Sequence, residues 1–421
     1  MFFSKNQLDI FKIKDFRNFI LGRFFLTLAI QMQMTTIGLQ AYYEFNKEIM
    51  VLGYISLAEV IPFIITSFFS GHVADIYNRK TIILFSTFLL FLGSVSLFVF
   101  CLPGLTILST CIPLLIIVVL FGIIRAFLAA AMSPFMSQLI DRNLYTKAVT
   151  WNSTFWHVGA ILGPIIAAWI YTLNDDFNAK TTYLINCSLF IVGLIAFMRI
   201  EKKAQSSSIK EPIYTSLKNG IQFVFKSKVL LSALSLDLFA VLFGGAVAIL
   251  QVFNDQVLHA SPSVFGLLRT APAIGAVISA GIMAFYPPER KAGKWLLVGV
   301  FAFGVCTIVF AFCKEFWLAF LMLFLTGAFD NISVIVRHSI LQLMTPEHMR
   351  GRVAAVNSIF IGSSNELGGF ESALAGKILG LIPSIAFGGA MTIVVVGCID
   401  KLNPQLKKLD IKELINEKET K

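Results

Sequence analysis

The most regular feature of the chain is an alternation of long apolar runs and short polar segments. Each apolar run has about 20 residues, the length that an α-helix needs to cross the hydrocarbon core of a bilayer. Helices are the expected form, because isolated strands would leave backbone groups unpaired in lipid. The pattern therefore predicts an all-α membrane protein with twelve transmembrane helices. The predicted spans cover residues 17–40, 50–71, 81–102, 112–136, 149–172, 182–198, 229–252, 264–285, 295–313, 317–343, 353–378 and 383–400.

The composition agrees with a membrane protein. Hydrophobic residues make up 57% of the 421 residues, phenylalanine alone contributes 41, and only 14% are charged, whereas soluble domains carry about 25% charged residues. The first span contains Arg23 and three glutamines and has no small-residue cleavage site, so we expect a retained helix and no cleaved signal peptide. The six cysteines lie in or at the ends of apolar spans without metal-ligand spacing, so we expect inert thiols and no metal site.

The lysines and arginines predict the orientation of the helices. Of these 34 residues, 26 lie at the two ends of the chain or in every second loop, and only Lys47, Lys180 and Lys314 lie in the alternate loops. Loops rich in Lys and Arg stay in the cytoplasm, so both termini are predicted to be cytoplasmic. These loops also account for the net charge of +10, so no nucleic-acid partner is expected.

The longest polar segment divides the spans into two sets of six. Its second part places Ile213, Leu217, Ile221 and Val224 at helical spacing, which predicts a short amphipathic helix on the cytoplasmic surface. The predicted parts are an N-terminal six-helix half (1–198), a cytoplasmic linker (199–228), a C-terminal six-helix half (229–400) and a cytoplasmic tail (401–421).

The two halves contain an internal repeat. A shift of 205 residues places Asn152 on Asn357 and Gly163 on Gly368, and both stretches enter an odd-numbered span from a basic loop. Because this match agrees with the division into six plus six spans, it indicates duplication.

A polar island between the second and third spans has the spacing Gly71-x-x-x-Asp75-x-x-x-Arg79-Lys80. The glycine permits close helix packing before the turn, and the acid and the two bases then lie at the membrane surface. A short cytoplasmic loop often carries Arg or Lys, but this spacing resembles the signature loop between helices 2 and 3 of the major facilitator superfamily. Asn78 replaces the usual glycine before the arginine. The resemblance implies two parallel six-helix halves working by alternating access, with this loop as a cytoplasmic gate.

The fifth span contains Gly159-Ala-Ile-Leu-Gly163-Pro164. Small residues four positions apart let helices approach closely, and proline bends a helix. The stretch resembles the G-x-x-x-G-P motif of superfamily antiporters, which implies export. Simple helix packing is the alternative.

Charged residues inside the predicted spans are candidates for lining a cavity, because a charge in hydrocarbon is costly. Under the 205-residue shift Arg125 lies on Asp330, and Arg23 lies on Asp237 when one gap is allowed. A carboxylate can lose its charge as its surroundings dry out, so Asp237 and Asp330 are candidates for proton coupling. A permanent ion pair with an arginine is the alternative for each. Arg23 lies near enough to the cytoplasmic surface for its side chain to snorkel.

Three glutamates extend this set: Glu59 in the second span, and Glu366 and Glu371 in the eleventh. They are candidates for substrate or proton binding, and hydrogen bonding between helices, with Arg269 and Arg337 as partners, is the alternative. The first-span glutamines Gln31, Gln33 and Gln40 are predicted to bond to neighbouring helices rather than to a ligand.

Residues 337–372 narrow the resemblance. This stretch is similar to bacterial enterobactin-exporter-like proteins, in the drug:proton antiporter branch that also includes macrolide efflux proteins. The similarity implies a monomeric, proton-coupled exporter of a siderophore-like or drug-like molecule in the bacterial inner membrane. Its partners would be a small organic substrate, protons and the bilayer, with no cofactor. The second-half counterpart of the gate loop, residues 286–294, lacks the aspartate, so its contacts are predicted to differ.

Three other functions are compatible with parts of this pattern. The same fold also serves importers of siderophores, nutrients or lipid-like solutes. A non-transporting membrane sensor would not need carboxylates within its spans. An enzyme would need a nucleophile beside a base, and the sequence has no such constellation and no phosphate-binding loop for ATP.

Overall fold

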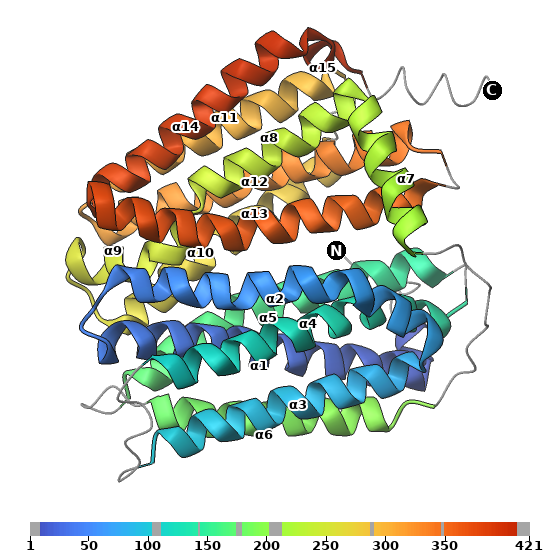
Figure 1. The fold of residues 1–421 in the computed structure, drawn as a ribbon, viewed down its shortest axis with the longest axis vertical. Coiled ribbons are helices and arrows are strands. Elements are labelled where there is room, and N and C mark those ends of the chain that lie inside the picture. Colours follow the sequence, from blue (N-terminus) through green and yellow to red (C-terminus); the bar gives the residue numbers. More distant parts are fainter. Residues whose placement is uncertain are drawn as a thin grey trace. The chain divides into compact units, whose positions relative to one another are not determined.

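The computed structural model describes residues 9–102, 111–141, 144–173, 179–201, 213–286, 290–346 and 349–410, and within these ranges it is almost entirely helical. Eleven of the twelve predicted spans each correspond to one long helix among the described residues, and the span at 229–252 begins with α8 (Figure 1). These helices are α1 (Lys14–Glu44), α2 (Ile49–Ile76), α3 (Arg79–Phe100), α4 (Ile112–Gln138), α5 (Tyr145–Tyr171), α6 (Ala179–Met198), α8 (Lys228–Gly244), α10 (Pro262–Phe285), α11 (Ala292–Ala311), α12 (Phe316–Met344), α13 (Arg350–Leu379) and α14 (Leu381–Leu402).

Eleven helices among the described residues are long and apolar enough to cross a membrane. The predicted span that falls outside this set corresponds to α13, which has 30 residues and is long enough by itself. Its asparagines, serines and two glutamates lower its hydropathy. Polar side chains on a spanning helix point to contacts with protein or a ligand, because lipid offers them no hydrogen bonds.

The predicted span at 229–252 is not one continuous helix. The helix α8 ends at Gly244, a 3-10 turn follows at Ala246–Ile249, and α9 covers Leu250–Gln256. Two consecutive glycines explain the break, since glycine is a poor helix former and adopts other backbone conformations at little cost.

The chain forms two compact units. The first unit consists of Met1–Val51, Ala58–Ile209 and Ser261–Thr270, and the second consists of Leu52–Leu57, Lys210–Ala260 and Ala271–Lys421. In the first unit α1 packs against α5 and α6, and α3 packs against α4 and α6. In the second unit α8 packs against α13 and α14, and α11 packs against α12 and α14 (Figure 1).

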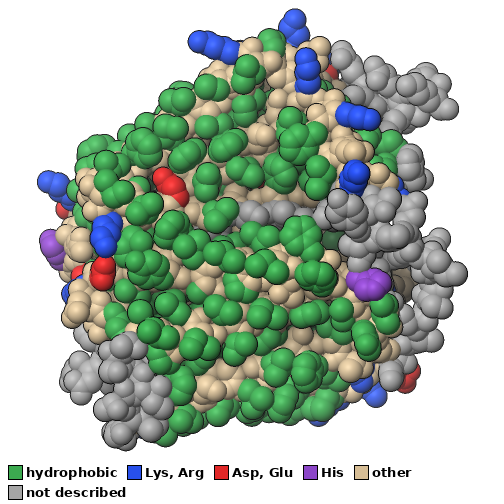
Figure 2. Space-filling view, in the orientation of Figure 1, with side chains coloured by type: hydrophobic (Ala, Val, Ile, Leu, Met, Phe, Trp, Pro, Cys, Tyr) green, Lys and Arg blue, Asp and Glu red, His purple; other side chains and the backbone are tan. Residues whose placement is uncertain are grey.

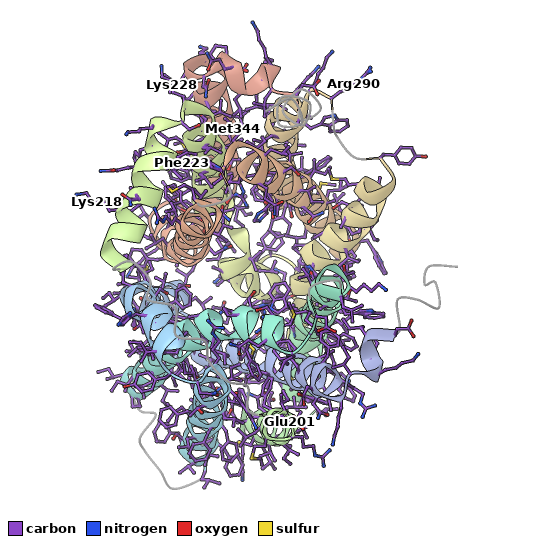
Figure 3. All side chains as sticks on the ribbon, turned by 90° about the vertical axis from the view of Figure 1, so that its right-hand side faces the viewer. Glu201, Lys218, Phe223, Lys228, Arg290 and Met344 are labelled. Carbon is purple, nitrogen blue, oxygen red and sulfur yellow. The ribbon has the colours of Figure 1, made fainter. Side chains whose placement is uncertain are left out.

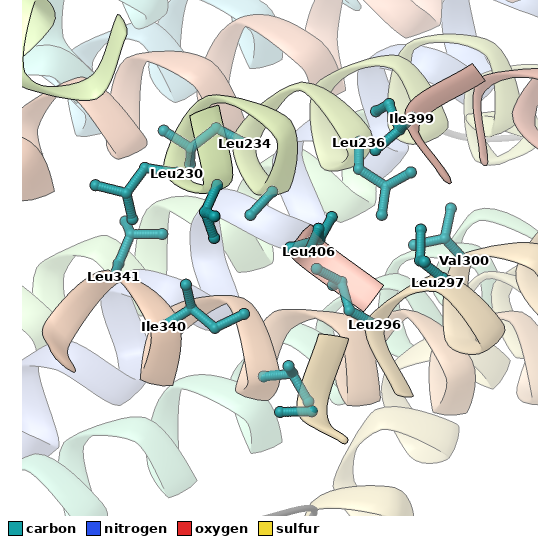
Figure 4. Packing of buried hydrophobic residues seen from close by; sticks show 14 of the residues in the cluster. Leu230, Leu234, Leu236, Leu296, Leu297, Val300, Ile340, Leu341, Ile399 and Leu406 are labelled. Atoms are coloured by element: carbon teal, nitrogen blue, oxygen red, sulfur yellow. The ribbon is translucent and has the colours of Figure 1, made fainter. Parts of the chain in front are cut away.

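The second unit has a continuous apolar core in which several helices meet (Figure 4). Leu234 of α8, Leu296 of α11 and Ile340 of α12 are buried there, together with Leu406 of the short helix α15 (Pro404–Lys408). The visible surface of the helices is also largely hydrophobic (Figure 2). A protein that exposes apolar side chains on this scale needs lipid around it.

The linker contains the predicted amphipathic helix, α7 (Ile213–Lys226). Val224 is buried in the core of the second unit and Phe223 packs against that core, while Lys218 is exposed (Figure 3). Ser227 then caps the start of α8 by accepting a hydrogen bond from the backbone N–H of Leu230 at 3.4 Å. Residues 202–212 of the linker lie outside the described ranges.

Glycines at equivalent positions of the repeat make equivalent helix contacts. A Cβ atom on Gly163 of α5 would lie 3.2 Å from the carbonyl oxygen of Leu28 in α1, and one on Gly368 of α13 would lie 2.9 Å from that of Val241 in α8. In the same way, a Cβ on Gly122 of α4 would overlap the Glu59 carbonyl of α2. Its counterpart Gly327 of α12 lies equally close to α10. The two units therefore place corresponding helices by corresponding close approaches.

Candidate functional site

Four of the charged residues within the spans form two ion pairs, one in each unit. In the first unit, Arg125 Nη1 of α4 contacts Glu59 Oε1 of α2. In the second unit, Arg337 Nη1 of α12 contacts Asp237 Oδ2 of α8. The side chain of Arg125 is 33% exposed, whereas that of Arg337 is only 2% exposed. The pairs thus differ in whether solvent or a ligand reaches the guanidinium.

The first-unit pair is placed by the local sequence of both helices. Gly122 lies one turn before Arg125, and its missing side chain lets α4 approach the backbone of α2 at Glu59. Pro62 inside α2 lies one turn beyond Glu59, where a proline weakens the regular helix. The close approach brings the arginine side chain to the glutamate.

Asp330 lies at the midpoint of α12 and has no ion pair or hydrogen bond among the described residues. It lies seven positions before Arg337, on the same face of the helix. Arg337 is held by Asp237. Under the 205-residue shift Asp330 is equivalent to Arg125, which is paired. The two units thus carry opposite charges at the centre of corresponding helices, one paired and one single.

The α13 glutamates differ in how much the structure describes of them. The side chain of Glu366 lies outside the described residues. Glu371 is partly buried, and the neighbouring Ser372 donates a hydrogen bond of 3.4 Å to the carbonyl oxygen of Gly245, at the break after α8. Arg337 contacts Asp237.

Arg23 of α1 is a further cation within a span. Its Nε is buried and makes no hydrogen bond, and the residue has no ion pair among the described residues. On one side of it, Gly22 abuts the ring of Phe197 in α6, and on the other Thr27 lies against Gly159 of α5. The residue as a whole is only partly buried.

The glycines of the antiporter-like motif lie at the contact between α5 and α1. A Cβ atom on Gly159 would lie 3.2 Å from Thr27, and one on Gly163 would lie 2.6 Å from the Cβ of Gln31. Pro164 follows inside α5. Both glycines of the motif therefore lie at a close contact between two helices.

Gln40 joins three helices of the first unit. Its amide nitrogen donates to both carboxylate oxygens of Glu44, at 3.1 and 3.0 Å, and to the sulfur of Cys101 at 3.4 Å. Its oxygen accepts a hydrogen bond of 2.7 Å from the hydroxyl of Tyr183. Gln40 thus bonds to neighbouring helices, whereas the buried amide nitrogen of Gln33 has no partner among the described residues.

The bases of the gate loop bind the ends of two helices. Arg79 Nε donates to the carbonyl oxygen of Ala74, near the end of α2, at 3.3 Å. Lys80 Nζ donates to the carbonyl oxygen of Met198, at the end of α6, at 2.9 Å, and also to that of Ile200. Positive groups are favourable at these ends, because unpaired carbonyls make them partly negative.

The other two gate residues are Gly71 and Asp75. A Cβ atom on Gly71 would meet no described atom within 4 Å. The side chain of Asp75 lies outside the described residues.

The equivalent loop of the second unit is held from the C-terminal tail. The backbone N–H of Lys291 donates to Asp410 Oδ2 at 3.3 Å, and that of Gly293 donates to the carbonyl oxygen of Leu409, also at 3.3 Å. An acid from the C-terminal tail thus contacts this loop, which lacks the aspartate of the first-unit loop. The sequence carried no signal for this contact, because Asp410 lies more than a hundred residues away.

Comparison with known proteins assigns the chain to a family. The model of the Major Facilitator Superfamily matches residues 19–369. The chain belongs to this superfamily. It is therefore a multi-pass membrane transporter and not an enzyme, as predicted. No group of three or more potential metal ligands occurs among its described His, Cys, Asp and Glu residues.

Two curated relatives and one solved structure are similar over most of their length. The Staphyloferrin A transporter of Staphylococcus aureus is 21% identical over 369 residues, which cover 85% of this chain and 88% of the relative. The multidrug efflux pump Tap of Mycolicibacterium fortuitum is 21% identical over 385 residues, covering 87% and 90%. A crystal structure of a POT family transporter has a TM-score of 0.73 at 13% identity, covering 93% of this chain and 96% of that chain. It shows the same fold.

Proposed function

We propose that this transporter is a proton-coupled exporter of a siderophore-like or drug-like organic molecule. The relatives support this substrate range, since one is named for transport of staphyloferrin A and another for multidrug efflux. The stretch that resembles superfamily antiporters, around Gly159 and Gly163, supports the direction. Transport would proceed by alternating access, with both termini in the cytoplasm.

The observation that carries the coupling is the single carboxylate of Asp330. It lies at the midpoint of a spanning helix and has no counter-charge among the described residues. An ionised carboxylate without a partner is costly in hydrocarbon, and binding a proton removes that cost. Asp330 therefore gives the protein a group whose charge changes as the site opens and closes. Asp237 is paired with Arg337 and is the weaker candidate.

The cytoplasmic gate would open and close in the same cycle of alternating access. In the proposed exporter, Asp75, Arg79 and Lys80 make their charged contacts when the cytoplasmic side is closed and lose them when it opens. Glu59, Arg125, Glu366 and Glu371 would line or gate the substrate path in the membrane. Each assignment joins a charged residue to a conformational step that transport requires.

The test is transport by the purified protein in proteoliposomes, with and without an imposed proton gradient. A labelled siderophore and a labelled macrolide are the two substrates. We expect movement of at least one of them against its concentration gradient, driven by protons. Asp330→Asn should abolish this accumulation while leaving exchange of substrate across the membrane at equal pH. Glu315→Gln, which removes an exposed acid at the N-terminal end of the same helix, should behave as the wild type.

The outcomes separate the alternatives. Substrate movement that ignores the proton gradient, or that survives Asp330→Asn, would refute proton coupling through this residue. Accumulation in the opposite direction would identify an importer. A protein that moves neither compound would contradict the proposed substrate range.

A further inference from the structure

Arg23 is a positive charge within the membrane-spanning part of the first unit that no carboxylate neutralises. It has no ion pair or hydrogen bond among the described residues. Two other arginines within spans, Arg125 and Arg337, each contact an acid of their own unit. The Nε of Arg23 is buried although the residue as a whole is only partly buried, and a buried donor without a partner is costly, so proteins rarely keep one without a use.

An aromatic cluster begins at the residue next to Arg23. The next residue, Phe24, contacts Phe155 of α5 with ring centroids 6.0 Å apart, and Phe155 in turn lies 6.0 Å from Trp151. Phe11 closes this aromatic cluster at 4.9 Å from Trp151. Apolar rings exclude water, and electrostatic attraction is stronger where water is excluded. An anion held beside this cluster would therefore be bound more firmly than at the surface.

A second polar atom without a partner lies in the helix packed against α1. The side-chain oxygen of Asn152 in α5 is buried and accepts no hydrogen bond among the described residues. Asn152 lies one turn before Phe155, which contacts the residue next to Arg23. The first unit thus holds an unsatisfied cation and an unsatisfied acceptor on adjoining helices. An anion that also carries an O–H or N–H group complements both.

The repeat argues against a purely structural purpose for Arg23. Its counterpart in the second unit is Asp237, which Arg337 of the same unit pairs. An acid within the first unit would satisfy Arg23 in the same way, yet the described part of the unit offers none. The counter-charge is therefore expected to come with a ligand.

We propose that Arg23 binds a carboxylate of the transported molecule, with Asn152 accepting a hydrogen bond from the same molecule, so that the substrates are carboxylate-bearing organic anions. The planar guanidinium suits a carboxylate because it donates two parallel hydrogen bonds. The inference rests on the proposed transport of organic molecules, but it needs neither proton coupling nor a direction of transport. It also separates two kinds of substrate, since a cationic drug would be repelled.

The experiment measures equilibrium binding to the full-length protein in nanodiscs by fluorescence anisotropy. The probes are carboxyfluorescein, an anion, and rhodamine 6G, a cation built on a similar ring system. We expect the wild type to prefer carboxyfluorescein, and Arg23→Gln to raise its Kd at least about tenfold. Arg23→Lys should retain part of the affinity, because an ammonium keeps the charge but not the paired donors. Arg17→Gln, which removes an exposed charge of the same helix, should change nothing.

Thermal stability distinguishes ligand binding from a structural role. If Arg23 awaits a ligand, Arg23→Gln removes a guanidinium without a partner among the described residues and leaves Tm equal or raises it. A fall in Tm would assign Arg23 to the fold instead. Equal carboxyfluorescein binding by the wild type and Arg23→Gln, no binding of it by the wild type, or a preference for rhodamine 6G would each overturn the proposal. Binding is measured at equal pH and without a proton gradient, so failure of proton coupling is separable from failure of this site.

Discussion

The two ion pairs within the spans place the same chemistry in different surroundings. In the second unit, Arg337 and Asp237 are 2% and 6% exposed, so neither water nor a ligand reaches them. In the first unit, Glu59 is 9% exposed but Arg125 is 33% exposed. A buried pair that loses one partner leaves an uncompensated charge, whereas a partly exposed guanidinium can be solvated or bind another anion. The comparison indicates that the Arg337–Asp237 pair is fixed and holds two helices together. The Arg125–Glu59 pair can exchange its contact for water or another anion.

The two ion pairs also differ in their positions within the internal repeat. Arg125 corresponds to Asp330 in the repeat, so the paired cation of one unit corresponds to the single carboxylate of the other. The buried Arg337–Asp237 pair lies two helical turns from Asp330, measured along α12. It therefore fixes α12 against α8 and keeps Arg337 from neutralising Asp330. This arrangement suits the proposed proton-coupled carrier, because Asp237 keeps its charge in the ion pair and only Asp330 has to change its charge.

The largest expected effect comes from breaking the buried pair. Arg337→Met should lower the free energy of unfolding by about 3–5 kcal/mol, because it leaves Asp237 buried without a partner. Arg125→Met should cost only about 1–2 kcal/mol, since its site is partly exposed. Thermal unfolding of both variants in the same detergent measures the difference.

A double substitution checks the cause of that loss. Asp237→Leu combined with Arg337→Met removes both charges and should recover most of the stability, as replacing a buried pair by apolar residues often does. If Arg125→Met were as destabilising as Arg337→Met, the exposure of the two arginines would not be the property that separates the pairs.

A smaller effect is expected from the glycine that positions the accessible pair. Gly122→Ala would place a methyl group against the Glu59 carbonyl, which should cost about 1–3 kcal/mol and move Glu59 away from Arg125. Because both changes act on one contact, Gly122→Ala combined with Arg125→Met should cost less than the sum of the two. Stability of the single and double variants measures this coupling.

The control for this prediction is Gly397→Ala in α14, where a Cβ atom would meet no described atom within 4 Å. It should leave stability unchanged or slightly higher, because alanine favours the helix. Strictly additive losses for Gly122→Ala and Arg125→Met would show that the close approach and the ion pair are independent.

The all-α membrane fold could be predicted because its signal is long and redundant. Twenty-residue apolar runs admit only helices, and every predicted range except 229–252 corresponds to one helix in the structure. The break after α8 was missed although Gly244 and Gly245 marked it, since the hydropathy of the segment continues across them. The sequence also shows that α13 is polar. Hydropathy alone therefore does not identify α13 as a membrane span.

The partners of the charged residues could not be predicted from the sequence. Spacing along one helix indicates which residues share a face, but it does not say which neighbouring helix supplies the opposite charge. The sequence therefore identifies Glu59 and Arg125 as candidate site residues, but only the structure shows that they form an ion pair. The contact of Lys291 with Asp410 is a stronger case, because it depends on where the C-terminal tail lies against α11.

The smallest expected effect lies in the two corresponding loops, which are held by opposite means. Lys80 holds its loop through a side chain that donates to the end of α6, whereas the second-unit loop donates backbone N–H groups to Asp410 and Leu409. Lys80→Met should cost about 0.3–1 kcal/mol, the usual contribution of a cation at a helix C-terminus. Hydrogen exchange should be faster at the end of α6 and unchanged at the start of α11. Asp410→Asn should have the reverse pattern. If either variant loosened both loops, the loops would be coupled rather than held separately, and the gate proposed for Asp75, Arg79 and Lys80 would have to include the C-terminal tail.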